Sequence, residues 1–144
     1  MSRAIAARFA AAARTYDRRA GIQRQAAARL IARLRRAALV AAPPEWVLEI
    51  GCGTGILTRK VRRAYPAARV CAIDVAPAMA RMTRRALRGD RRLFVVAADG
   101  AQFALRRRVP LIVSSSTLHW LAPLDRTLRH LASLLEPGGC WPSR

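Results

Sequence analysis

The chain has 144 residues, of which 53% are hydrophobic, and it carries a formal net charge of +19 at pH 7. This length and apolar content indicate one folded domain and exclude a disordered chain. No apolar run reaches the roughly 20 residues needed to cross a bilayer. The three cysteines contain no Cys-x-x-Cys pair and are typical of reduced core thiols, so we expect a soluble, cytoplasmic protein that does not use membranes.

Arginine supplies almost all of the positive charge, since Lys60 is the single lysine. A field this positive attracts polyanions, including nucleic acid and acidic proteins. The arginines are scattered along the chain and are not interleaved with aromatic residues, as those of a single-strand nucleic-acid binder would be. We therefore favour compositional drift over a dedicated nucleic-acid surface as the origin of the charge.

The first part of the chain, up to Pro43-Pro44, is predicted to be helical. A short helix over residues 5–16 is followed by a longer amphipathic one. In the longer helix, apolar residues recur every four positions and form one stripe. The residues of this stripe are Ile22, Ala26, Leu30 and Leu34.

Strands and helices then alternate. We predict strands at residues 46–50, 69–75, 93–98 and 111–115, and helices at residues 54–64, 77–88 and 124–136. This alternation predicts an α/β fold, a Rossmann-like doubly wound parallel sheet of strand order 3-2-1-4 with right-handed crossovers.

The most informative stretch is VLEIGCGTG, residues 47–55. A buried strand stops at a carboxylate, Glu49, and opens into Gly51, Gly53 and Gly55 before a helix begins. Glycines let the backbone of such a turn pass close to a ligand, and the helix points its unpaired N–H groups into the same space. The sequence therefore predicts a nucleotide-type site at this turn.

Acidic residues end the next two predicted strands, in a chain that has only 8 Asp and Glu residues. Asp74 follows Gly55 by about 20 residues, the spacing at which an acid accepts hydrogen bonds from ribose hydroxyls. Asp99 ends the next strand and is placed to accept from an adenine amino group. In strand order 3-2-1-4 these ends line one crevice.

The glycine spacing separates two classes of ligand. A dinucleotide-binding turn would have glycine at position 56, where this chain has Ile56. Glu49 at the mouth of the turn would repel a pyrophosphate and favour a sulfonium cation. These two features favour S-adenosylmethionine over NAD.

Taken together, residues 49–55, Asp74, Asp99-Gly100 and the LEPGG run at 135–139 look like the class I S-adenosylmethionine-dependent methyltransferases. More narrowly, residues 9–30 and the IVSSSTLHWL run at 112–121 resemble the malonyl-acyl-carrier-protein O-methyltransferases of biotin synthesis. The resemblance spans almost the whole chain.

The resemblance implies a role for each of several residues at the cofactor. Gly51, Gly53 and Gly55 would face the methionine part. Met79 would pack near the adenine, with Asp74 on the ribose and Asp99 on the adenine amino edge.

Three further residues would act above the cofactor. Tyr16 would close over the carboxylate of the cofactor, although it also fits a core position between two helices. His119 and Trp120 would face the methyl acceptor, and an ordinary loop histidine is the alternative for His119.

The implied reaction is methyl transfer from sulfur to the free carboxylate of malonyl-acyl carrier protein by a monomeric enzyme. The basic exterior suits an acidic carrier protein. Two alternatives remain open: methylation of another small carboxylic acid or of RNA, and an inactive fragment.

We expect a single domain over residues 1–144, with a helical lid region at 1–42, a cofactor-binding core at 43–139 and an aberrant tail at 140–144. The family's sheet continues after Pro-Gly-Gly, whereas this chain stops at Arg144 and carries Pro142, which would spoil a central strand. We therefore expect strands five to seven to be missing, with strand four as an open edge, as in a C-terminally truncated protein.

Overall fold

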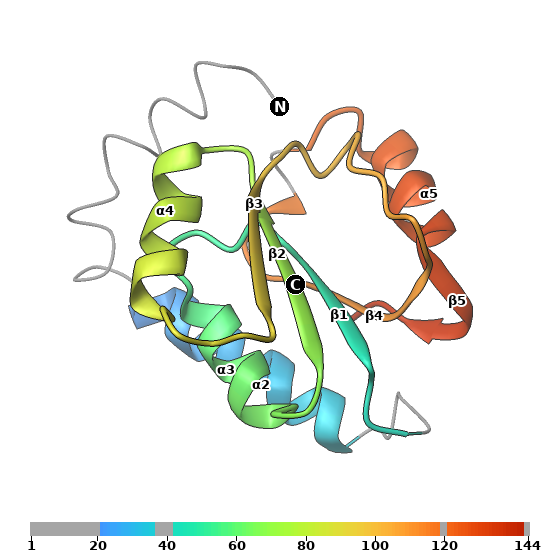
Figure 1. Ribbon diagram of the computed structural model, residues 1–144. Coiled ribbons are helices and arrows are strands. Elements are labelled where there is room, and N and C mark those ends of the chain that lie inside the picture. The colour runs from blue at the N-terminus through green and yellow to red at the C-terminus, as the bar shows by residue number, and fades with distance from the viewer. Residues whose placement is uncertain (1–20, 37–41, 119–120, 143–144) are drawn as a thin grey trace.

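The computed structural model describes residues 21–36, 42–118 and 121–142, and in these it contains one sheet of five parallel strands in the order β3-β2-β1-β4-β5 (Figure 1). The strands are β1 (Trp46–Ile50), β2 (Arg69–Asp74), β3 (Leu93–Ala97), β4 (Val109–Ser114) and β5 (Leu135–Cys140). The predicted α/β fold and the order of the first four strands are confirmed.

The register of the sheet brings the carboxyl ends of three strands together. Ile50, the last residue of β1, pairs with Ile73 of β2 on one side and with Ser114 of β4 on the other. The loops that follow these strands therefore open at one edge of the sheet, where ligands bind in open α/β folds.

Helices cover both faces of the sheet. Figure 1 shows α2 (Gly21–Arg36), α3 (Ile56–Ala64) and α4 (Pro77–Ala86) on one face, and α5 (Leu124–Ser133) beside β5 on the other. Each face has its own apolar core. Leu30 and Val61 belong to the first core, and Ile112 and Leu131 belong to the second.

The buried stripe of α2 differs from the predicted one. Ile22 is 80% exposed, and the residues that pack on α3 and the sheet are Ala27, Leu30, Ile31 and Leu34. These follow the spacing of three and four residues that keeps side chains on one face of a helix, whereas a strict spacing of four drifts around it. Only the later part of the predicted stripe was therefore correct.

The expectation that strand five is missing was wrong. The helix ends at Ser133 rather than at residue 136, and Leu135–Cys140 pairs in parallel with β4. Pro137 and the two glycines fit because β5 is irregular here, with a register shift opposite Val109/Leu111 and a φ of 78° at Gly138. The strand ends before Pro142.

Strand β4 is consequently an interior strand and not an open edge. Leu111, Ile112 and Val113 are fully buried between the two helical layers. The outer strand on the other side is β3, where Phe94 is 45% exposed. Its ring stacks on Trp46 with a centroid distance of 5.6 Å.

None of the described helices is both long enough and apolar enough to span a membrane.

Substitutions in α2 test the corrected stripe. Leu30→Ala removes a side chain that is 1% exposed, and we expect it to lower the free energy of unfolding by about 2–5 kcal/mol. Ile22→Ala changes an exposed side chain and should shift that free energy by less than about 0.5 kcal/mol. Urea unfolding of the two variants checks this, and equal losses would contradict the observed packing.

Candidate functional site

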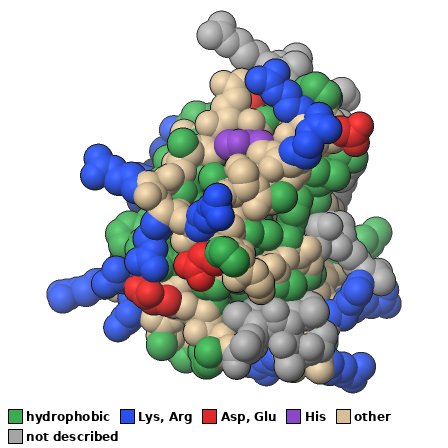
Figure 2. Space-filling view, turned by 90° about the vertical axis from the view of Figure 1, so that its right-hand side faces the viewer, with side chains coloured by type: hydrophobic (Ala, Val, Ile, Leu, Met, Phe, Trp, Pro, Cys, Tyr) green, Lys and Arg blue, Asp and Glu red, His purple; other side chains and the backbone are tan. Residues whose placement is uncertain are grey.

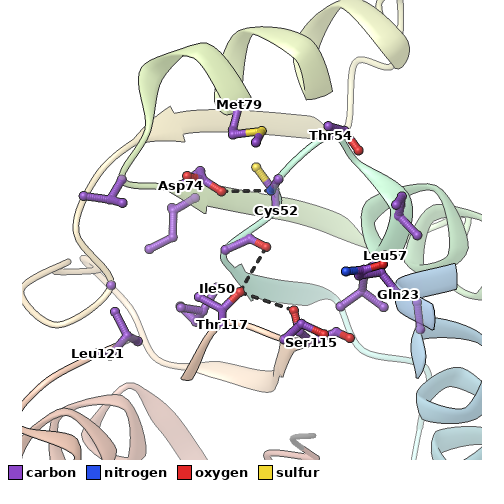
Figure 3. A pocket seen from close by; sticks show the side chains of 18 of the residues that line it. Gln23, Ile50, Cys52, Thr54, Leu57, Asp74, Met79, Ser115, Thr117 and Leu121 are labelled. Carbon is purple, nitrogen blue, oxygen red and sulfur yellow. Dashed lines mark hydrogen bonds between the residues drawn. The ribbon is translucent and has the colours of Figure 1, made fainter. Parts of the chain in front are cut away.

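A cleft opens at the carboxyl edge of the sheet, above the turn between β1 and α3 (Figure 3). Asp74 and Met79 lie on one side of it, and Ser115 and Thr117 lie on the opposite side. Gln23, from α2, lies at one end. The remaining lining residues are mostly apolar and include Ile50, Leu57, Ile73, Val75, Ala98 and Leu121.

The glycine turn is held against the end of β2 by the backbone. The amides of Gly51 and Cys52 both donate to the carbonyl oxygen of Ile73, at 2.8 and 2.9 Å. Gly51, Gly53 and Gly55 have φ values of 75°, 56° and 87°, a region that side-chain-bearing residues seldom adopt. The sequence-based prediction of a tight glycine turn is confirmed.

The glycines of this turn face different surroundings. A Cβ at position 51 would lie only 2.1 Å from Oγ1 of Thr117, so the close approach of the β4–α5 loop requires glycine there. A Cβ at position 53 would meet no protein atom within 4 Å. Gly53 lines the cleft, so its missing side chain leaves room for a ligand.

Gly55 does not belong to the cleft lining, and its contact with the cofactor stays a prediction. It is the N-cap residue of α3, and a Cβ there would lie 3.2 Å from Oγ1 of Thr83 on α4. Its structural role is to let these two helices approach each other.

Asp74 ends β2 and binds two backbone amides with its two carboxylate oxygens. Oδ2 accepts from the Gly53 amide at 2.9 Å, and Oδ1 accepts from the Ala76 amide at 2.8 Å. Burial raises the pKa of Asp74, and the two amide hydrogen bonds oppose that rise. The carboxylate keeps lone pairs for a ligand hydroxyl, because each oxygen accepts more than one hydrogen bond.

Met79, from the first turn of α4, is 2% exposed and lines the cleft next to Asp74. Its thioether side chain provides an apolar, polarisable surface of the kind that packs against an aromatic ring. The structure therefore brings Met79 and Asp74 together on the same wall of the cleft, and their contacts with the adenine and the ribose stay predictions.

Glu49 lies below the turn and not at its mouth. Its side chain is fully buried, it does not line the cleft, and neither carboxylate oxygen has a hydrogen-bond partner in the described structure. Burial raises the pKa of Glu49 to about 8, and the nearby charge of Asp74 adds to the rise. The carboxyl group is mostly neutral at pH 7, so the predicted negative charge at the mouth of the turn is wrong.

Asp99 is half-buried beside the cleft. Its neighbours Ala98 and Gly100 line the cleft, but Asp99 does not, and its Oδ1 accepts from the Ala101 amide at 3.0 Å. The structure thus places Asp99 near the end of β3 with a local turn-forming role. Its contact with an adenine amino group stays a prediction.

The polar wall after β4 is the part of the site that the sequence-based prediction missed. Ser115, Ser116 and Thr117 line the cleft, and Ser116 has a φ of 60°, an uncommon value for a non-glycine residue that recurs at binding sites. Thr117 donates weakly to the carbonyl oxygens of Gly51 and Ser115, at 3.5 and 3.3 Å. A polar loop directly after a buried strand was the available signal.

Cys52 lines the cleft but is 4% exposed. Burial raises its pKa well above the usual range, so the thiol stays protonated and is a poor nucleophile. This environment agrees with the expectation of a reduced core thiol. Tyr16, His119 and Trp120 lie outside the described residues, and their roles remain predictions.

The known proteins that this chain resembles are methyltransferases. Residues 48–141 match the model of a methyltransferase domain family. The chain is 38% identical over 125 residues to a malonyl-[acyl-carrier protein] O-methyltransferase of Anoxybacillus flavithermus. This match covers 87% of this chain and 46% of that protein. The chain thus spans about half the length of such relatives.

Two solved structures share the fold. The N-methyltransferase NodS of Bradyrhizobium japonicum, in complex with S-adenosyl-L-homocysteine, has a TM-score of 0.67 at 26% identity and covers 78% of this chain and 58% of that one. The SAM-bound amino pentose methyltransferase CalS10 of Micromonospora echinaspora has a TM-score of 0.69 at 25% identity, covering 81% and 48%.

The buried carboxyl of Glu49 predicts a pH-dependent stability. The unfolded chain ionises this group near pH 4.5, whereas the folded protein keeps its proton up to about pH 8. The unfolded state therefore binds fewer protons between these values, and the free energy of unfolding falls as the pH rises through them, by roughly 3–5 kcal/mol.

Urea unfolding at pH 5, 7 and 9 measures this effect. Glu49→Gln should remove most of the pH dependence, because an amide does not ionise. Glu45→Gln is the matched control, since its side chain is 64% exposed and should leave the dependence intact. An unchanged pH profile in Glu49→Gln would contradict the assignment.

Proposed function

Because the chain belongs to the methyltransferase domain family, we propose that it binds S-adenosylmethionine in this cleft and transfers the methyl group to the free carboxylate of malonyl-acyl carrier protein in biotin biosynthesis. The observation that supports this proposal most directly is the contact between Gly53 and Asp74 at the carboxyl edge of the sheet. An open space above a glycine there adjoins a carboxylate that can accept from a ribose.

The chemistry of the cleft fits this cofactor in three places. Gly51 and Gly53 would border the methionine part, Asp74 would accept from the ribose hydroxyls, and Met79 would pack on the adenine. The apolar remainder of the lining suits a ligand whose charge is confined to one end. When bound, S-adenosylmethionine supplies an electrophilic methyl group on a sulfonium.

Methylation of this acceptor would need no proton transfer by the protein. A malonyl carboxylate is already ionised at neutral pH, so no general base is needed. In the described lining Asp74 is the one carboxylate, and its oxygens are engaged by amides. Catalysis would come from holding the acceptor in line with the methyl group and from excluding water by the apolar walls.

Ser115 and Thr117 would form the acceptor side, because they face Asp74 and Met79 across the cleft. Their hydroxyls can donate to a carboxylate oxygen. His119 and Trp120, which follow in the same loop, remain our proposed substrate contacts.

The charge distribution supports an acidic protein as the partner. Helices α2, α3 and α4 carry twelve Arg and Lys residues and no Asp or Glu. On the opposite side, α5 carries Asp125 and β5 carries Glu136, and Figure 2 shows acidic side chains among the basic ones on that face. The excess of positive charge on one layer would steer an acidic carrier protein to that side, in the cytoplasm.

Calorimetric titration with S-adenosylmethionine tests the cofactor assignment. We expect saturable binding by the wild-type chain, and a loss of at least about tenfold in affinity for Asp74→Ala, because that change removes both the ribose acceptor and the support of the Gly53 amide. His119→Ala should have a much smaller effect. A folded wild-type sample that fails to bind would contradict the proposal. Equal losses in the two variants would contradict the assignment of Asp74 to the cofactor and His119 to the acceptor.

Two pairs of charge-neutralising substitutions test the docking side. Arg35→Gln with Arg36→Gln removes two exposed charges from α2, and Arg126→Gln with Arg129→Gln removes two from α5. The α2 pair should weaken binding of malonyl-acyl carrier protein by about twofold to fivefold at low salt, more than the α5 pair, and the difference should fade as salt screens it.

The same variants separate the alternatives. Transfer to a malonyl thioester of a small thiol should be equal in both pairs, because that acceptor has no acidic surface. Equal effects of the two pairs on the carrier protein would count against a docking side. Tight binding of RNA that falls steeply with salt would favour RNA as the acceptor.

A further inference from the structure

Thr83 is a buried polar residue that the reaction described above does not use. It lies on α4, its side chain is fully buried, and its hydroxyl donates to the carbonyl oxygen of Gly53 at 2.9 Å. A hydroxyl in the middle of a helix more often bonds within its own helix or faces solvent. Here it reaches across to the glycine turn of another element.

The hydrogen bond of Thr83 complements that of Asp74. Asp74 accepts from the N–H of Gly53, which fixes the peptide group before the Gly53 Cα, and Thr83 donates to the C=O of Gly53, which fixes the peptide group after it. Both backbone dihedrals of Gly53 are thus set by side chains from β2 and α4. This matters because glycine has the largest conformational freedom of any residue.

Thr83 also supports the next glycine of the turn. Its Oγ1 and Cγ2 would lie 3.2 and 3.4 Å from a Cβ at position 55, so its side chain fills the space directly beside Gly55. Gly55 caps α3 without a side-chain hydrogen bond. One side chain of α4 therefore contacts the turn at both Gly53 and Gly55.

We propose that Thr83 is a positioning residue for the cofactor: its hydroxyl fixes the Gly53 peptide in the orientation that borders the methionine part. This inference rests on the proposed function. It adds a role for a residue that lies behind the turn and has no contact with the cleft, since Thr83 is absent from the lining.

Two substitutions separate the hydroxyl from the shape of the side chain. Thr83→Val keeps the shape and removes the donor, and Thr83→Ser keeps the donor and removes the methyl group. Thr127→Val is the matched control, because Thr127 on α5 is 1% exposed and donates to the Pro123 carbonyl at 3.1 Å, away from the cleft. Thermal unfolding verifies that each variant is folded.

Calorimetric titration with S-adenosyl-L-homocysteine is the first readout. We expect Thr83→Val to bind about fivefold to tenfold more weakly than wild type, in line with the loss of one hydrogen bond, and Thr83→Ser to stay within about twofold. Thr127→Val should bind like wild type. Wild-type affinity in Thr83→Val, or an equal loss in Thr127→Val, would overturn the proposal.

Hydrogen exchange at residues 51–55 of the ligand-free protein is the second readout. Thr83→Val should exchange faster there than wild type, whereas Thr83→Ser and Thr127→Val should not. If the wild-type chain binds no ligand, the proposed function fails, and this exchange still decides whether Thr83 orders the turn. Unchanged exchange in Thr83→Val would refute the positioning role.

Discussion

The contact between the glycine turn and the end of β2 is the interaction on which the site depends. Parallel pairing brings Ile50 beside Ile73, and the chain then turns so tightly that two successive amides share the carbonyl of Ile73. The next amide, that of Gly53, reaches the carboxylate of Asp74. The strand register, the glycines and the acid thus act together, and removing any one of them would displace the others.

The negative charge of the described cleft lining comes from Asp74 and not from Glu49. The sequence predicts a negative charge from Glu49 at the turn, but Glu49 is fully buried, and its raised pKa keeps it mostly protonated at neutral pH. Among the described residues that line the cleft, Asp74 is the one carboxylate; burial raises its pKa, and two backbone amides oppose that rise. The one carboxylate of the described cleft lining therefore also holds the turn in place.

Much of the fold and part of the site could be predicted from the sequence, because alternating strands and helices and a glycine-rich turn are local patterns. The predictions that were wrong concern features that depend on contacts with other elements of the fold. The rotation of α2 that exposes Ile22 is set by packing on α3. Glu49 is buried because its strand, β1, is an interior strand between β2 and β4. Pro137 ends helices in isolation, but beside β4 the same run makes an irregular strand. The polar residues at 115–117 lie in a run that resembles the family, but only the folded structure shows that they face Asp74 across the cleft.

The close approach of Gly51 to Thr117 joins two positions 66 residues apart in the chain. A side chain at position 51 would collide with Thr117, and the positive φ there would remain unfavourable even if residue 117 were smaller. Variation is therefore one-sided: position 117 is free to change only while position 51 stays glycine. In evolutionary terms the loop after β4 can diversify in sequence, whereas the glycine on which it packs cannot.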